Sequence, residues 1–133
     1  MLTGDCVCGT VLSFEREQQG RRFKEDRMSS RQLGDYEVLS HQETPECSLR
    51  LLRFTKDAAV RPHHHHKTTQ TYFVLEGTVQ VTVGEETSII GPHQILRAPV
   101  DAVHSLQGTG DALVLSISIP PLQASDQHVA AHR

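Results

Sequence analysis

Tryptophan is absent from this chain of 133 residues, and there are only two tyrosines and four phenylalanines. Proteins that bind single-stranded nucleic acids stack bases on aromatic side chains, and nucleic-acid-binding domains in general carry a basic patch or stripe. The formal net charge here is −3, and the sequence shows neither a basic stripe nor zinc-finger spacing. We therefore predict no nucleic-acid partner.

Long apolar runs are also lacking. Nothing approaches the roughly 18 consecutive apolar residues that a membrane-spanning helix needs, so we expect no membrane partner. The N-terminal segment MLTGDCVCGTVLSF has no basic start followed by an apolar stretch, so it does not read as a signal peptide. The expected location is cytoplasmic.

Cysteine is scarce and odd in number, with Cys6, Cys8 and Cys47. An odd count without a signal peptide argues against a disulfide framework. The Cys6-x-Cys8 pair has a spacing that can bind a soft metal, but a single such pair is weak evidence, and reduced thiols in a reducing compartment are the simpler interpretation. We interpret these residues as ordinary thiols.

The length of the chain corresponds to one domain, with a segment of different character at each end. Residues 1–34 are rich in charge and are predicted to form an N-terminal arm, either solvated or packed on a partner subunit. Residues 35–121 carry the strand-like patterns. Residues 122–133 form a short polar tail, which we expect to be loosely held.

Short apolar or alternating runs recur between turn residues over the middle of the chain, which is typical of an all-β fold. The two clearest alternations are Val79, Val81 and Val83, and Leu113, Leu115, Ile117 and Ile119 opposite Ser116 and Ser118. The predicted strands are Tyr36–Ser40, Ser48–Phe54, Gln70–Leu75, Thr78–Val83, Thr87–Ile90, Gln94–Ala98, Val103–Leu106 and Ala112–Ile119. Strands at this spacing predict a sandwich or a barrel.

Histidine is the residue in excess: there are nine, four of them consecutive. In an extended segment alternate side chains share a face, so His63 and His65 point one way and His64 and His66 the other. Two imidazoles at i and i+2 can bind one metal ion if further ligands arrive from elsewhere, and His104 is the obvious one. A purification tag is disfavoured because the run is internal, whereas a solvated loop without metal stays open.

The histidine run resembles the first motif of the cupin superfamily. His63-x-His65 is followed by four residues, then Gln70, then six residues and Gly77, which matches that motif's spacing. Gln70 replaces the usual glutamate, and the initial glycine is absent. The alternative register, which uses His64 and His66, also falls within the motif's tolerance.

A second, more degenerate motif follows in the expected order. Pro99 and His104 are kept, Asp101 replaces a glycine, His93 stands at the place of the leading glycine, and Gly108 replaces an asparagine. The resemblance covers about residues 36–120. It implies a double-stranded β-helix, also called a jelly-roll or RmlC-like barrel, and a homodimer.

The resemblance also implies one divalent metal ion held by His63, His65 and His104, with Gln70 as a possible fourth ligand. An amide in place of a carboxylate removes one negative charge, which disfavours hard ions such as manganese. Iron, nickel, copper and zinc suit imidazole ligands better. If Gln70 is not a ligand, the ion has several open positions for substrate or dioxygen.

Further side chains are candidates for the pocket of such a barrel. Tyr72 shares a face with Gln70, and Arg53 and Arg97 lie on predicted strands from which they could bind a carboxylate in bidentate fashion. His93 and Asp101 flank the second motif and could act as acid or base, although loop roles are the simpler interpretation.

Two main functions compete. The first is a metal-dependent enzyme on a small molecule, either a dioxygenase or an isomerase, lyase or cyclase that polarises a carbonyl. The second is a binding or sensing module without catalysis, since fold does not fix function. A structural relic with an empty site is a third interpretation.

Overall fold

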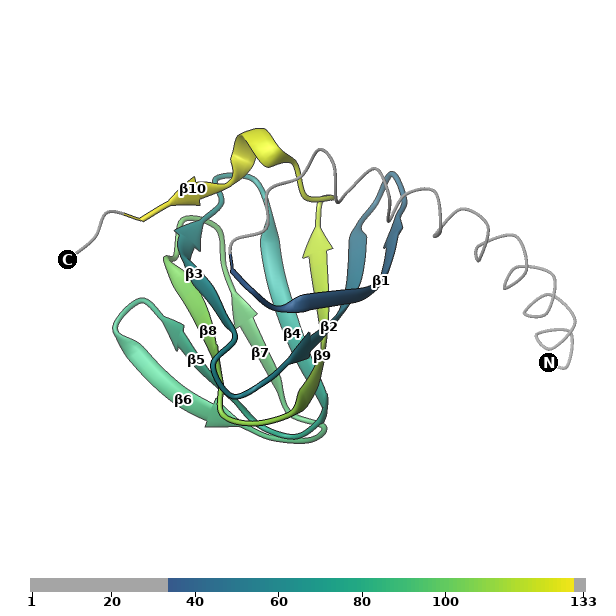
Figure 1. Ribbon diagram of the computed structural model, residues 1–133. Coiled ribbons are helices and arrows are strands. Elements are labelled where there is room, and N and C mark those ends of the chain that lie inside the picture. Colours follow the sequence, from purple (N-terminus) through teal and green to yellow (C-terminus); the bar gives the residue numbers. More distant parts are fainter. Residues whose placement is uncertain (1–33, 131–133) are drawn as a thin grey trace, which may run out of the picture.

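The computed structural model describes residues 34–130, which form two five-stranded antiparallel sheets that face each other (Figure 1). One sheet has the order β1-β2-β9-β4-β7 and the other β10-β3-β8-β5-β6. The elements are β1 (Glu37–Glu43), β2 (Ser48–Phe54), β3 (Ala59–His64), β4 (Thr69–Glu76), β5 (Val79–Val83), β6 (Glu86–Ile90), β7 (Ile95–Ala98), β8 (His104–Gly108), β9 (Ala112–Ile119), the short 3₁₀ helix η1 (Ala124–Asp126) and β10 (His128–Val129).

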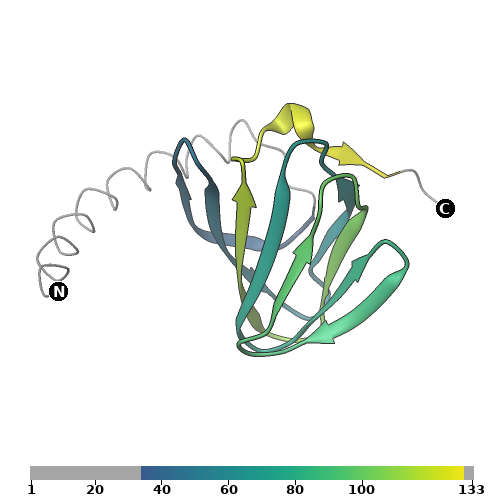
Figure 2. The same ribbon diagram turned by 180° about the vertical axis from the view of Figure 1, so that it is seen from behind.

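The predicted all-β double-stranded β-helix is confirmed. Each predicted strand has a counterpart, while β3 and β10 were not predicted as strands. Consecutive strands often lie in different sheets, so the chain passes back and forth across the barrel (Figure 2). Within residues 34–130 there is no helix long and apolar enough to cross a membrane.

The barrel interior is apolar at one end and polar at the other. Along β9, Ala112 and Val114 are buried at the first end, and Ser116 and Ser118 are buried at the second. The predicted alternation on this strand is therefore present, with the serine face turned inward and Leu113, Leu115 and Ile117 on the outer face. The buried serines make this end of the barrel interior polar, whereas the other end is apolar.

The same gradient continues in the neighbouring strands. On β4, Gln70 lies opposite Ser118, Tyr72 opposite Ser116 and Val74 opposite Val114. On β8, the fully buried Leu106 belongs to the apolar end, whereas His104 belongs to the polar end. The apolar end is the core that holds the two sheets together, with burial contributing about 25 cal/mol per Å².

The turn between β4 and β5 requires glycine. Gly77 has φ +77°, and a Cβ built there would lie 2.2 Å from the carbonyl oxygen of Asp111. We expect Gly77→Ala to lower the free energy of unfolding by about 2 kcal/mol or more, because left-handed strain and a backbone clash add. Chemical denaturation measures the change.

Gly84 is a matched control, since it has φ +63° and open space where a Cβ would be. Gly84→Ala should cost about 1 kcal/mol from strain alone. If the two variants lost the same free energy of unfolding, the close approach of Gly77 to the Asp111 carbonyl would contribute nothing to the cost.

Two residues that replace motif glycines keep a glycine-like backbone. His93 has φ 71° and Asp101 has φ 67°, both in the left-handed region that side chains seldom adopt. The degenerate second motif therefore retains the backbone path of the motif that it resembles, at a cost in strain.

The C-terminal segment differs from the expectation of a loosely held tail. Its last described residues form η1 and β10, and β10 pairs with β3 through His128↔His64 and Val129↔His63. Most of the predicted arm, residues 1–33, and both Cys6 and Cys8 lie outside the described residues. Gly34 makes an isolated bridge to Val60.

Candidate metal centre

The structure brings His63, His65 and His104 together in the polar end of the barrel. Their candidate ligand atoms all lie within 4.8 Å of one another, and the three side chains are only 3%, 1% and 1% exposed. The ring centroids are 4.3 Å apart for His63 and His104, 4.9 Å for His63 and His65, and 5.6 Å for His65 and His104.

Strand pairing places these three rings. His63 on β3 lies directly opposite His104 on β8, so their side chains share the inward face of one sheet. His65 follows β3 in the connection to β4, where the chain crosses to the other sheet. Gln70 then enters from that facing sheet, on β4. The cluster therefore joins both sheets.

One nitrogen of each ring is fixed by a backbone carbonyl. Nδ1 lies 2.7 Å from the Arg61 oxygen in His63, 2.9 Å from the Asp126 oxygen in His65, and 2.9 Å from the Ala102 oxygen in His104. A carbonyl oxygen only accepts, so Nδ1 carries the proton and donates in each case. In the neutral rings, Nε2 is left with its lone pair, which is the state of a metal-binding histidine held by its outer partner.

The electrostatics keep these rings neutral. Burial is the main cause that lowers the pKa of His63 to about 3 and that of His104 to about 4, and burial also lowers the pKa of His65. Each neighbouring imidazole disfavours a charge on the others. Since a ligand must be unprotonated, the cluster is ready to bind a cation at neutral pH.

Gln70 turns its carbonyl oxygen toward this cluster. Oε1 lies 2.8 Å from Nε2 of His104 and 3.1 Å from Nε2 of His65, and it accepts a hydrogen bond of 2.9 Å from the Tyr72 hydroxyl. The amide nitrogen donates to Ser118 Oγ at 3.1 Å, which fixes the orientation of the amide.

The donor set fits a divalent metal ion. Neutral His65 and His104, with Nδ1–H already committed, present Nε2 lone pairs to an amide oxygen that is itself an acceptor. Acceptors that face each other in a buried site repel unless a cation lies between them. Three imidazole nitrogens and one carbonyl oxygen suit iron, nickel, copper or zinc.

Tyr72 is 2% exposed, and burial raises the pKa of its hydroxyl, so it stays protonated and donates to Gln70. It lies beside the cluster as predicted from its face on the strand.

A cavity opens on one side of the cluster. It is lined by Tyr36, Arg50, Leu52, Val60, His63, Gln70, Tyr72, Ser116, Leu122 and Gln127. The arginine of this cavity is Arg50, which lies opposite Ser116 on β9, and Ser116 lies in turn opposite Tyr72 on β4. Arg50 therefore lies on the inward face of its sheet, in register with Ser116 and Tyr72 beside the histidine cluster.

The two arginines named from the sequence lie elsewhere. The Arg53 side chain is 52% exposed and its Nε is 3.9 Å from Oε1 of Glu37, while Arg97 is exposed on β7. Neither lines the cavity, because each occupies the outward parity of its strand. Leu52 and Phe54 are the apolar residues that mark the inward face of β2. Alternation from them would have indicated Arg50, which shares that face, rather than Arg53.

The residues expected as possible acids or bases are also outside the centre. Asp101 Oδ1 is 2.7 Å from Nδ1 of His66 on the surface, and the backbone N–H of Asp101 donates to the His65 carbonyl at 2.7 Å. His93 is exposed in the turn between β6 and β7. Asp101 therefore supports the backbone of a candidate ligand rather than lining the cavity.

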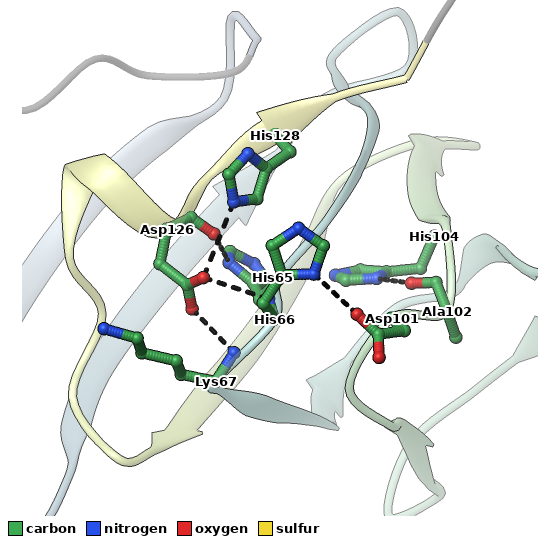
Figure 3. A network of polar contacts seen from close by, with 8 residues as sticks. All are labelled: His65, His66, Lys67, Asp101, Ala102, His104, Asp126 and His128. Carbon is green, nitrogen blue, oxygen red and sulfur yellow. Dashed lines mark hydrogen bonds and ion pairs between the residues drawn. The ribbon is translucent and has the colours of Figure 1, made fainter.

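Asp126, which no sequence pattern indicated, fixes the turn that carries His65 (Figure 3). Its carboxylate accepts the backbone N–H of His66 at 2.9 Å and that of Lys67 at 3.0 Å, and its carbonyl holds His65 Nδ1. Burial opposes the charge, but these two N–H groups keep the pKa of the carboxyl below its usual value.

We expect Asp126→Asn to lower the free energy of unfolding by about 1–3 kcal/mol, since an amide NH₂ must face a backbone N–H. Metal affinity should fall by about tenfold, because the turn that aims His65 loosens. Denaturation and metal titration measure the two effects. Asp57→Asn, at an exposed turn position, is the control; an Asp126→Asn variant indistinguishable from it would contradict this role.

Fold and site together define a small jelly-roll barrel with an interior histidine cluster that could hold a metal. A family model described as "Cupin domain" matches residues 50–119, and the chain belongs to the cupin family.

Individual relatives are distant. The chain is 25% identical over 100 residues to a mannose-1-phosphate guanylyltransferase 2 of Escherichia coli O157:H7, of which that match spans only 20%. Among solved structures, the protein TT1209 from Thermus thermophilus has a TM-score of 0.60 at 25% identity, covering 67% of this chain and 85% of that one.

A Klebsiella pneumoniae protein with a double-stranded β-helix domain has a TM-score of 0.62 at 18% identity, covering 74% of this chain and 85% of that one. At such identity the likeness shows the fold alone. The chain spans about a fifth of the curated relatives it matches, so their activities do not transfer to it.

Proposed function

We propose that the chain is a metal-dependent enzyme that acts on a small anionic molecule in the cavity beside the histidine cluster. The observation that carries the proposal is the arrangement of three neutral imidazoles, each with Nδ1 held by a carbonyl, around the oxygen of Gln70. An ion held there would be reachable from the cavity that His63 and Gln70 line, as a catalytic rather than a structural site requires.

His63, His65 and His104 are the proposed ligands, with Gln70 Oε1 as the fourth. A bound transition metal supplies Lewis acidity toward a carbonyl or carboxylate oxygen and, if it is iron, reactivity with dioxygen. The reaction is therefore an oxygenation, or an isomerase, lyase or cyclase step that begins by polarising a carbonyl.

The chain's own residues determine what can bind. Arg50 lines the cavity wall, and its guanidinium suits a carboxylate or phosphate of the substrate. Tyr72 keeps its proton and orients Gln70, and both side chains are buried beside the cavity. A small molecule with an anionic group and a neighbouring oxygen would meet both Arg50 and the metal.

The test compares two arginines on one strand. Metal-loaded protein is screened by thermal shift against small keto and hydroxy carboxylates and sugar phosphates, and each stabilising compound is followed for product by mass spectrometry. Arg50→Ala should abolish the stabilisation and the turnover, whereas Arg53→Ala, on the outer face of β2, should change neither. Stabilisation that survives in Arg50→Ala would contradict the proposed substrate contact.

The alternative function is a binding or sensing module without catalysis. The replacement of a carboxylate ligand by Gln70 favours it, since the ligand set departs from the motif at a position that lines the cavity. It predicts ligand-dependent stabilisation without product. A turnover that requires metal and is lost in His63→Ala would exclude it.

The outer face of the first sheet supports the homodimer that the resemblance implies. Leu113, Leu115 and Ile117 point outward there, and Ile95 and Ile119 are 66% and 57% exposed. A second copy of the chain would cover such a face. Sedimentation of the protein and of Ile117→Lys should give a dimer and a monomer respectively, and a monomeric wild type would contradict this partner.

A further inference from the structure

A second group of three histidines lies on the outside of the barrel: His64, His66 and His128. Their ring centroids are 5.0 Å apart for His64 and His66, 5.2 Å for His64 and His128, and 4.4 Å for His66 and His128. These separations fall within the range of 4.3–5.6 Å between the ring centroids of His63, His65 and His104, the central trio. The rings are therefore as close together as those of the candidate metal centre.

The fold creates this outer cluster from two parts of the chain that are far apart in the sequence. His64 and His66 have the opposite parity to His63 and His65, so they face away from the interior. His128 reaches them because β10 adds to the edge of β3 with His128 directly opposite His64. No spacing in the sequence indicated His128, which lies more than sixty residues from the histidine run.

Two carboxylates lie close to the rings of His66 and His128 (Figure 3). Asp101 Oδ1 lies 2.7 Å from Nδ1 of His66, and Asp126 Oδ1 lies 3.6 Å from Nε2 of His128. The Asp101 carboxylate accepts the Nδ1–H of His66, which leaves Nε2 of that ring free for a metal and raises its basicity. His64 adds a buried Nδ1 without a hydrogen-bond partner within residues 34–130.

We propose that His64, His66 and His128 form a second transition-metal site that fastens β10 to β3. Zinc, nickel or copper suits three imidazoles with carboxylates behind them. Among residues 34–130, the central trio alone already has its ligand atoms within 4.8 Å of one another, so the outer rings must turn to converge. They have room to do so, since the side chains of His66 and His128 are 57% and 37% exposed.

An ion at this site has a structural consequence for the central one. β10 contains only two residues and lies shortly after Asp126, whose carbonyl holds His65. An ion shared between β3 and β10 would hold that carbonyl in place. The outer ion thus stabilises the segment on which one central ligand depends.

Zinc titration followed by equilibrium dialysis at micromolar zinc tests the proposal. The variants are His128→Ala, which removes an outer ring and leaves the run His63–His66 intact, and His104→Ala, which removes a central ligand. His93→Asn is the control, at an exposed histidine whose left-handed backbone asparagine tolerates. Thermal unfolding with and without zinc is recorded for each.

We expect two equivalents of zinc in the wild type and in His93→Asn, and one in each of the other two variants. Two equivalents in His128→Ala would overturn the proposal, because the consecutive histidines would then suffice. A single equivalent in the wild type that only His104→Ala loses would overturn it as well. A single equivalent lost only in His128→Ala would support the outer site and count against the central one.

Discussion

Replacing His104 by alanine should lower the affinity of the central site for zinc or iron by at least about a hundredfold. Losing a ligand costs more than losing an outer hydrogen-bond partner, for which about 10–100-fold is typical. The ring of His104 is 1% exposed, and its Nε2 lies 2.8 Å from the oxygen of Gln70, so no water-exposed side chain can replace it without opening the barrel.

The fold should survive this change. His104 belongs to the polar end of the interior, away from the apolar core around Val74, Val81 and Val114. We expect a loss of about 1–3 kcal/mol in the free energy of unfolding of the metal-free protein, from the cavity and the lost bond to Ala102. A competition titration with a chromophoric chelator measures affinity, and His93→Asn serves as the control. An affinity within about threefold of the wild type would remove His104 from the ligand set.

Gln70→Glu should raise the affinity for manganese by about 10–100-fold. The variant places a negative charge among three neutral imidazoles, where the low-dielectric surroundings strengthen its attraction for a divalent ion. Manganese prefers carboxylate oxygen more strongly than zinc does, so the ratio of manganese to zinc affinity should rise. The hydroxyl groups of Ser118 and Tyr72, which now hydrogen-bond the amide of Gln70, can both donate to a carboxylate at the same position.

Gln107→Glu controls for the added charge, since Gln107 is exposed on β8, the strand that also carries His104. It should leave both affinities nearly unchanged. If Gln70→Glu had no greater effect than Gln107→Glu, the side chain at position 70 would not reach the ion, and the site would consist of three histidines alone.

The sequence was sufficient for most of the strands and for most of the histidine cluster. Period-2 patterns such as Val79, Val81 and Val83 fix the face of a strand without knowledge of its neighbours. The spacing from His63 and His65 to Gln70 spans one turn between two strands, so local geometry determines it. His104 was named as a further ligand from the sequence, but no local pattern shows that it lies opposite His63, because that position depends on a non-local pairing of β3 and β8.

The remaining features depend on parity and on tertiary pairing. Arg50 and Arg53 are three residues apart on one strand, so they point to opposite faces, and a charged residue gives no sign of which face is inward. Asp126 acts through a backbone carbonyl and two backbone N–H groups, none of which has a sequence signature. β10 is two residues long, too short for any alternation to be visible.

The central claim is that the barrel interior holds a transition metal on His63, His65 and His104. The most direct measurement is elemental analysis of tag-free His128→Ala protein, from which the outer cluster is removed, beside the same protein that also carries His63→Ala and His65→Ala. We predict about one equivalent of iron, nickel, copper or zinc in the first and none in the second. Absence of metal from the first, with no uptake when each ion is offered, would contradict the claim.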